Sequence, residues 1–226
     1  SENTFIPSLL FSVLYFFSYD TLALSNELLG SGFLLLALNN LFQEIEFRHE
    51  RDESIFNLGL CISLASLFSF AFIVYLPCAI VILLLFTRST ARKYLLLVFG
   101  FLLPHLLVIS IAYVKDSTGP LWDYYYLFNL SFARDEFVSS RTLLTLAAIP
   151  LIYFGISLFM LNREARFSKY QSQIVQAVFI WLAFSLLFLL YAKDLRPQTL
   201  VVFIPGLALL LTHFFLLIRR KKFVTL

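Results

Sequence analysis

The chain alternates between long apolar segments and short charged ones along almost its whole length. Eight apolar segments are candidates for membrane-crossing helices, at 5–24, 28–43, 55–70, 72–87, 93–114, 142–161, 174–192 and 198–218. A helix needs about 20 apolar residues to cross the hydrocarbon core, whereas strands of a membrane barrel alternate apolar and polar residues. Because these segments are continuously apolar, the sequence predicts an all-α fold. We expect one polytopic transmembrane helical bundle of about 8 spans over residues 1–226.

Region 55–87 decides the number of spans. As a single helix it would extend roughly 50 Å at about 1.5 Å per residue, far beyond a hydrocarbon core of about 30 Å. We therefore expect two shorter helices with a turn near Ser69 and Phe70.

The lysines and arginines then fall unevenly on the two sides of the membrane. Of the 17 in the chain, five lie on one side and the rest on the other. The five are Lys115, Arg134, Arg141, Lys193 and Arg196. Cytoplasmic loops carry an excess of Lys and Arg, so the larger group predicts that both termini are cytoplasmic. Four of that group, Arg219, Arg220, Lys221 and Lys222, end the last span and are expected to anchor it to anionic lipid.

Composition excludes several classes of function. Hydrophobic residues make up 60% of the chain and charged residues 14%, too little polar surface for a soluble domain. The net charge of +3 is small and concentrated at the C-terminus, so we expect no nucleic-acid partner. Cys61 and Cys78 lie in apolar segments, and no metal-ligand motif occurs, so we expect neither metal nor cofactor. The N-terminal SENTF has no basic segment and predicts no cleavable signal peptide.

The longest external loop, 115–141, carries most of the candidate chemistry. It opens with the turn signal DSTGP at 116–120 and is rich in aromatic residues. One hypothesis is an amphipathic segment lying on the outer leaflet; the others are a lid over a lipid-linked sugar and a protein-docking surface. The candidate surface residues are Trp122, Tyr124, Tyr125, Tyr126 and Arg134. Under the lid hypothesis the candidate catalytic acids are Asp123, Asp135 and Glu136.

Polar residues elsewhere have simpler interpretations. The cytoplasmic loop 43–54, QEIEFRHERDES, is expected to be a solvated turn whose charges pair locally. His105 follows Pro104 in the middle of a span, and a structural role beside the proline kink is favoured over a proton relay. No span carries an acid near its middle, which weighs against an ion-coupled transporter.

Four stretches carry a resemblance to known families: GFLLLALNNLF (32–42), SIFNLGLCISLASLFSF (54–70), FGFLLPHLL (99–107) and LRPQTLVVFIPGLALLLTHFF (195–215). In this order they resemble an uncharacterised family of polytopic inner-membrane proteins from Bacteroidota. The resemblance implies a location in the bacterial inner membrane and no assigned activity. The helix around NLGLCISLASLF also resembles the membrane half of GT-C glycosyltransferases, which use an acid in a large first external loop that this chain lacks.

Two functions follow as hypotheses. The first is a non-enzymatic accessory or scaffold subunit of a membrane or envelope-biogenesis complex, whose partners are the lipid bilayer and other membrane proteins. The alternative is a GT-C-like transferase or handler of polyprenyl-linked sugars that uses loop 115–141.

Overall fold

The computed structural model describes residues 25–47, 52–87, 90–127, 169–191 and 201–210, with isolated positions 9, 12, 13 and 155. Within this part of the chain all regular structure is helical and no strand occurs. The expected spans 5–24 and 142–161 lie outside the described residues, apart from those isolated positions. The fold class is therefore all-α over the described ranges.

The helices follow the expected apolar segments with shifted ends. In chain order they are α2 (Asn26–Phe47), α3 (Asp52–Phe68), η1 (Phe70–Val74), α4 (Tyr75–Phe86), α5 (Ala91–Val114), α6 (Thr118–Pro120), η2 (Leu121–Leu127) and α9 (Lys169–Tyr191). A further apolar helix spans Val201–Leu210. Three helical segments are long and apolar enough to cross a membrane: Asn26–Glu46, Ala91–Val114 and Tyr170–Phe188.

The apolar region 55–87 is broken where the sequence predicted a turn. α3 ends at Phe68, and Ser69 has extended backbone angles of φ −146° and ψ 118°. The five residues of the 3-10 helix η1 then lead into α4. A short 3-10 segment between helices is a common way to change chain direction.

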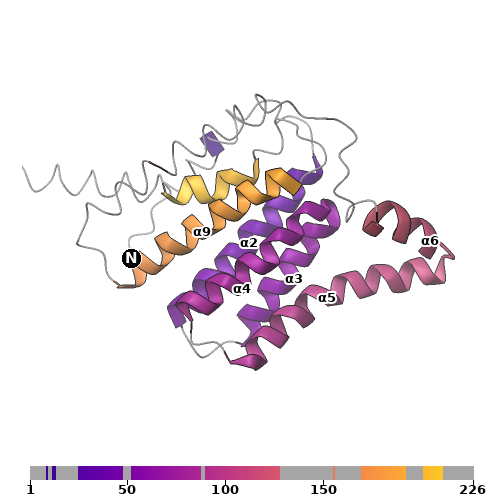
Figure 1. Ribbon diagram of the computed structural model, residues 1–226, viewed down its shortest axis with the longest axis horizontal. Helices are drawn as coiled ribbons and strands as arrows, with labels where there is room; N and C mark the ends of the chain where they lie inside the picture. Colours follow the sequence, from indigo (N-terminus) through magenta and orange to yellow (C-terminus); the bar gives the residue numbers. More distant parts are fainter. Residues whose placement is uncertain are drawn as a thin grey trace, which may run out of the picture.

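Polar contacts fix the directions of the helices. Glu44, near the end of α2, pairs with Lys93, in the first turn of α5. Asp52, at the start of α3, pairs with Arg92. The end of α2 and the starts of α3 and α5 therefore lie together, and α4 ends there too because Thr87 precedes Ala91 by only four residues. Successive helices from α2 to α5 thus alternate in direction, and Figure 1 shows them side by side.

α4 and α9 enclose an aromatic core. The rings of Tyr75 and Trp181 lie 4.5 Å apart, and those of Phe72 and Phe188 stack at 4.8 Å between centroids. The Tyr75 hydroxyl bonds Ser185 Oγ at 2.7 Å, and Ser185 donates to the carbonyl of Trp181. Tyr75 is fully buried, and this bond supplies the partner that a buried hydroxyl requires.

α3 and α5 run parallel and touch through two glycines. A Cβ built on Gly59 would meet the backbone of Leu97 closer than 3.0 Å, and one on Gly100 would meet the backbone of Phe56 equally closely. Small residues at such positions let helix backbones approach in membrane proteins. The two glycines therefore set the distance between α3 and α5.

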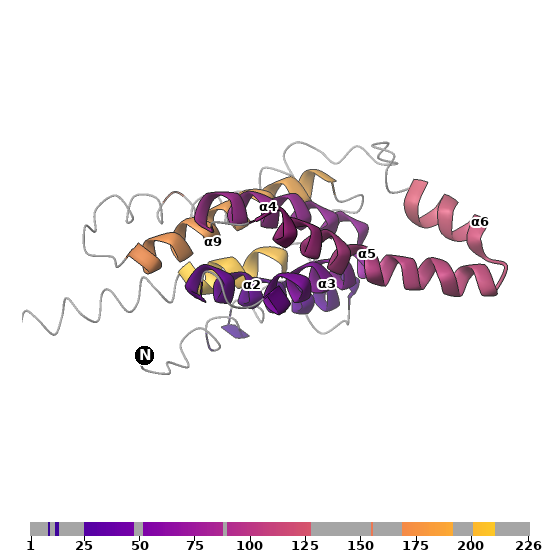
Figure 2. The same ribbon diagram turned by 90° about the horizontal axis from the view of Figure 1, so that it is seen from below.

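The second half of α5 extends beyond this contact. Figures 1 and 2 both show α5 running out past α2, α3 and α4 before the chain turns back through α6. In residues 102–114 the buried positions are Pro104, His105 and Ala112, while most of the others are exposed. This half of α5 is therefore attached to the bundle along one narrow edge.

Candidate functional site

The aromatic segment after α5 starts with a sharp reversal of the chain. The amide of Ser117 donates to the carbonyl of Ala112 and that of Asp116 to the carbonyl of Tyr113, the two bonds of a Schellman motif. Asp116 takes the left-handed position, with φ 49°, that glycine usually fills. The turn signal at 116–120 is therefore confirmed, and it directs η2 back toward the bundle.

Two tyrosines of η2 bind the bundle. The Tyr125 hydroxyl donates to the backbone carbonyl of Ser66 in α3, and its ring packs edge-on against Phe70 of η1. The Tyr126 hydroxyl lies 3.0 Å from Nδ1 of His105 in α5. Burial raises the pKa of both tyrosines, so both hydroxyls keep their protons at neutral pH. η2 is thus joined to α3, η1 and α5.

His105 lies at the centre of a directed chain of hydrogen bonds. Ser66 donates its hydroxyl proton to the carbonyl of Ser63 at 2.7 Å. His105 Nε2, 3.0 Å from Ser66 Oγ, must therefore be the protonated nitrogen and the donor. Nδ1 is then the acceptor of a hydrogen bond that the Tyr126 hydroxyl donates. The ring uses both nitrogens in these bonds, which join α5 to α3 and η2.

This chain of bonds has the residue types of a catalytic dyad but not its proton arrangement. A serine nucleophile needs a histidine lone pair facing its own proton. Here the Ser66 proton points to a backbone carbonyl, and the serine is fully buried. The chain of hydrogen bonds also ends at the Ser63 carbonyl, which has no proton of its own to pass on. The arrangement holds helices together and is neither a nucleophile site nor a relay.

The outward side of the segment carries the remaining candidates. Trp122 and Asp123 line an open hollow of about 350 Å³ together with Ile109, Thr118, Gly119 and Leu121. Trp122 is 54% exposed, and its ring lies 5.4 Å from that of Tyr126. A carboxylate beside an indole suits a ligand that offers hydroxyl or ammonium groups.

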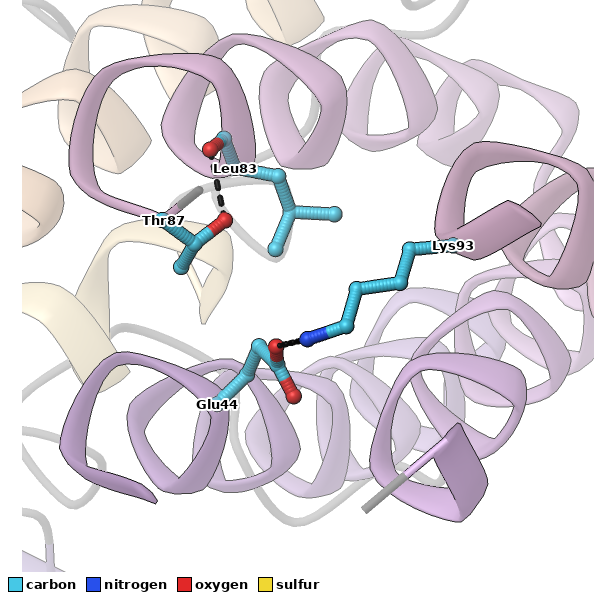
Figure 3. A network of polar contacts seen from close by, with 4 residues as sticks. All are labelled: Glu44, Leu83, Thr87 and Lys93. Atoms are coloured by element: carbon cyan, nitrogen blue, oxygen red, sulfur yellow. Dashed lines mark hydrogen bonds and ion pairs between the residues drawn. The ribbon is translucent and has the colours of Figure 1, made fainter. Parts of the chain in front are cut away.

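A second cluster of charges lies at the opposite end of the bundle. Figure 3 shows Lys93 of α5 reaching across to Glu44 of α2, next to Thr87 at the end of α4. Both charged side chains are almost completely buried, at 7% and 3% exposure. Thr87 donates to the carbonyl of Leu83 at 2.6 Å and closes the end of α4. Burying two charges is tolerated because each neutralises the other.

The neighbouring contacts in this cluster are exposed. Asp52 and Arg92 pair at 2.7 Å with side chains 42% and 78% exposed. The hydroxyl of Tyr170, at the start of α9, donates to Glu46 at 3.2 Å. The expectation of a solvated turn with locally paired charges is therefore wrong for Glu44, which is buried against Lys93. Glu46 and Asp52 have the distant partners just described, and Arg48 and Arg51 lie outside the described residues. α2 continues through Phe47, so Glu44 and Glu46 lie on its last turns, where Glu44 is buried and Glu46 is exposed beside Tyr170.

The remaining candidates are placed only in part. Tyr124 belongs to η2, but its side chain is outside the described part of the chain. Arg134, Asp135, Glu136 and the basic tail Arg219, Arg220, Lys221 and Lys222 also lie outside it. The structure thus brings Trp122 and Asp123 to one hollow and turns Tyr125 and Tyr126 toward the bundle. Among the described residues, no group of three or more His, Cys, Asp and Glu could hold a metal ion.

Ser66 and Lys93 were not among the candidate residues predicted from the sequence. Ser66 is one of several small residues in α3 and carries no distinguishing pattern. Lys93 has a weak signal, since it is a cation one turn inside an apolar helix and needs a partner there. Comparisons with protein-family models, curated proteins and solved structures give no match to this chain.

Proposed function

We propose that this chain is a non-catalytic subunit of a larger complex in a bacterial inner membrane, where α5 binds a neighbouring membrane protein. The observation that carries the proposal is the second half of α5. Its large apolar side chains are exposed around most of the helix, and the bundle covers only a narrow edge. A helix that packs on the bundle along only one edge can pack a second helix against its remaining faces. Such a partner makes closer van der Waals contacts than lipid tails do.

The face of α5 that we propose binds the partner consists of three leucines and one isoleucine. These side chains lie away from the edge where His105 packs on the bundle. Leu103, Leu106, Leu107 and Ile111 are each between 41% and 58% exposed. No charged residue interrupts α5 between Lys93 and its end at Val114, so this face suits another apolar helix. The proposed arrangement has about eight spans with both termini cytoplasmic, which places η2 at the outer side. This placement rests on the distribution of Lys and Arg.

Site-specific photo-crosslinking tests the proposal directly. A photoreactive residue replaces Leu106 in one variant and Leu85 in another, because both leucines are apolar and similarly exposed, at 58% and 62%, but on different helices. We expect a discrete, light-dependent protein adduct from position 106 and none from position 85. Purification in mild detergent should then recover the same protein in fixed ratio. Lipid adducts alone at position 106 would contradict the proposal.

A second function is favoured by the hollow at Trp122 and Asp123. A polyprenyl-linked sugar offers hydroxyl groups to the carboxylate and a ring face to the indole, while its apolar chain would lie along α5. Under this alternative the chain is a GT-C-like transferase or a handler of such lipids. A polyprenyl lipid that co-purifies with the protein and is lost with Asp123→Ala supports it. Retention of that lipid by the variant argues against it.

A further inference from the structure

The contact between Tyr126 and His105 depends on the protonation state of the imidazole. A neutral imidazole has one nitrogen that donates and one that accepts. In this structure Nε2 donates to Ser66 and Nδ1 accepts from Tyr126. Ser66 both donates and accepts, whereas each ring nitrogen has one role, and this set of donors and acceptors exists only when His105 is neutral.

A second proton on the ring would break this arrangement. Nδ1 would become a donor, so the Tyr126 hydroxyl could stay bonded to it only by turning its own proton away, which leaves that proton without the acceptor it has now. Among the described residues, the groups that contact the ring carry no charge to compensate the new cation. They are Ser66 from α3, Tyr126 from η2 and Phe101 from α5, and Tyr125 and Phe70 pack in turn against Tyr126.

No ion pair of the described residues involves His105. The acid closest to it along η2 is Asp123, which is exposed at the outer hollow. The ring of Phe101, with its centroid 5.0 Å away, offers a weak attraction to a cation, worth about 1 kcal/mol. Protonation therefore takes the acceptor from a part-buried hydroxyl and places on the ring a charge that the described residues compensate poorly.

We propose that η2 is a strap whose Tyr126 contact with α5 is held by neutral His105, and that uptake of a proton by His105 releases this contact. Release frees Tyr126 together with Trp122, whose ring packs on it, and so changes the surface next to the hollow. The backbone reversal at Asp116 and Ser117 provides the hinge for this movement. The inference rests on the hydrogen-bond chain and holds whether or not the proposed partner exists.

Trp122 provides a reporter within the strap. The chain has two tryptophans, and Trp181→Phe leaves Trp122 alone. Trp181 is buried, and its Nε1 has no hydrogen-bond partner in the described part of the chain, so phenylalanine removes an unsatisfied donor and keeps an aromatic ring. The protein is reconstituted in lipid nanodiscs, and the fluorescence anisotropy decay of Trp122 is followed as pH is lowered.

We expect a reversible, one-proton loss of Trp122 anisotropy between about pH 6.5 and pH 5, the acid side of the range in which histidine ordinarily titrates, because burial disfavours the charged ring. His105→Gln should abolish the transition, because glutamine keeps hydrogen-bonding groups but does not titrate there. His49→Gln and His213→Gln are the matched controls and should keep it, and Asp123→Asn should keep it too. A transition that persists in His105→Gln, or its absence from the parent protein, would overturn the proposal.

Tyr126→Phe gives an independent test should the His105 variant fail to fold. Phenylalanine keeps the ring but cannot donate to Nδ1, so the strap should already be loose at pH 8. Its Trp122 anisotropy should then match that of the parent protein at pH 5 and change little on acidification. Equal anisotropy of parent and variant at pH 8 would contradict a latch formed by this hydrogen bond.

Discussion

Glu44 of α2 and Lys93 of α5, which are 49 positions apart in the chain, form a buried ion pair that joins the two helices at one end of the bundle. Removing one partner of such a pair leaves an uncompensated buried charge, at a cost of roughly 3–5 kcal/mol. The adjacent pair of Asp52 and Arg92 joins α3 to α5 but is exposed, and exposed pairs contribute about 0–1 kcal/mol. Lys93 and Arg92, which are neighbours in α5, therefore differ greatly in how much their ion pairs matter for stability.

Lys93→Met should destabilise the protein strongly, while Arg92→Met should change its stability little. Thermal unfolding in detergent, followed by tryptophan fluorescence, measures both. Glu44→Leu combined with Lys93→Met removes both charges and should recover much of the stability lost in the single variant. Equal losses for Arg92→Met and Lys93→Met would show that burial does not distinguish the two pairs.

The sequence predicted the helices better than it predicted these contacts. Continuous apolar segments and the length of 55–87 sufficed to predict helices and the break at Ser69. The partner of Glu44 could not be predicted, since it depends on how the end of α2 lies against the start of α5. The many charged residues of segment 43–54 instead suggested a solvated turn. A buried carboxylate near a helix end looks the same in sequence as an exposed one.

Gly59→Ala and Gly100→Ala should each destabilise the contact between α3 and α5. An alanine inside a helix ordinarily gains about 1 kcal/mol over glycine, but here the added methyl meets the backbone of the other helix. Overpacking of this kind costs about 1–3 kcal/mol, because a backbone cannot turn aside as a side chain can. The net expected change is a loss of stability, measured by thermal unfolding.

Gly32→Ala is the control for this prediction. A Cβ at Gly32, within α2, meets nothing within 4 Å, so the substitution should leave stability unchanged or raise it by up to about 1 kcal/mol. Stabilisation by Gly59→Ala of the same size as by Gly32→Ala would mean that α3 and α5 do not approach closely.

Asp116→Val should weaken the reversal that directs η2 back to the bundle. Asp116 has φ 49°, and a β-branched residue in the left-handed region costs about 1–2 kcal/mol. Amide hydrogen exchange over residues 112–118 should become faster, because the two bonds of the Schellman motif open more often. Lys115→Val, at φ −93°, is the matched control and should leave exchange nearly unchanged. Asp116→Gly should slow the exchange or leave it unaltered.

The candidate site shows a similar limit of prediction. The DSTGP sequence predicted the turn, and the aromatic residues of 121–127 indicated that this segment is a candidate site. Which tyrosine faces the bundle depends on the π-helical turn of η2 and on the divergence of α5 from α3, neither of which has a sequence signature. Tyr125 and Tyr126 therefore lie against α3 and α5, although the sequence grouped them with Trp122 on an outer surface.

The two ends of α5 provide a test of the proposed membrane arrangement. α5 has 24 residues, and at about 1.5 Å per residue it is longer than a hydrocarbon core of about 30 Å. Thr90 and Thr118 are exposed on either side of it, and Cys61 and Cys78 can be replaced by alanine to provide a cysteine-free background. A membrane-impermeant maleimide should label Thr118→Cys in intact spheroplasts, but Thr90→Cys only after permeabilisation. Labelling of both positions from the same side would show that α5 does not cross the membrane, and the reverse pattern would invert the orientation derived from the lysines and arginines.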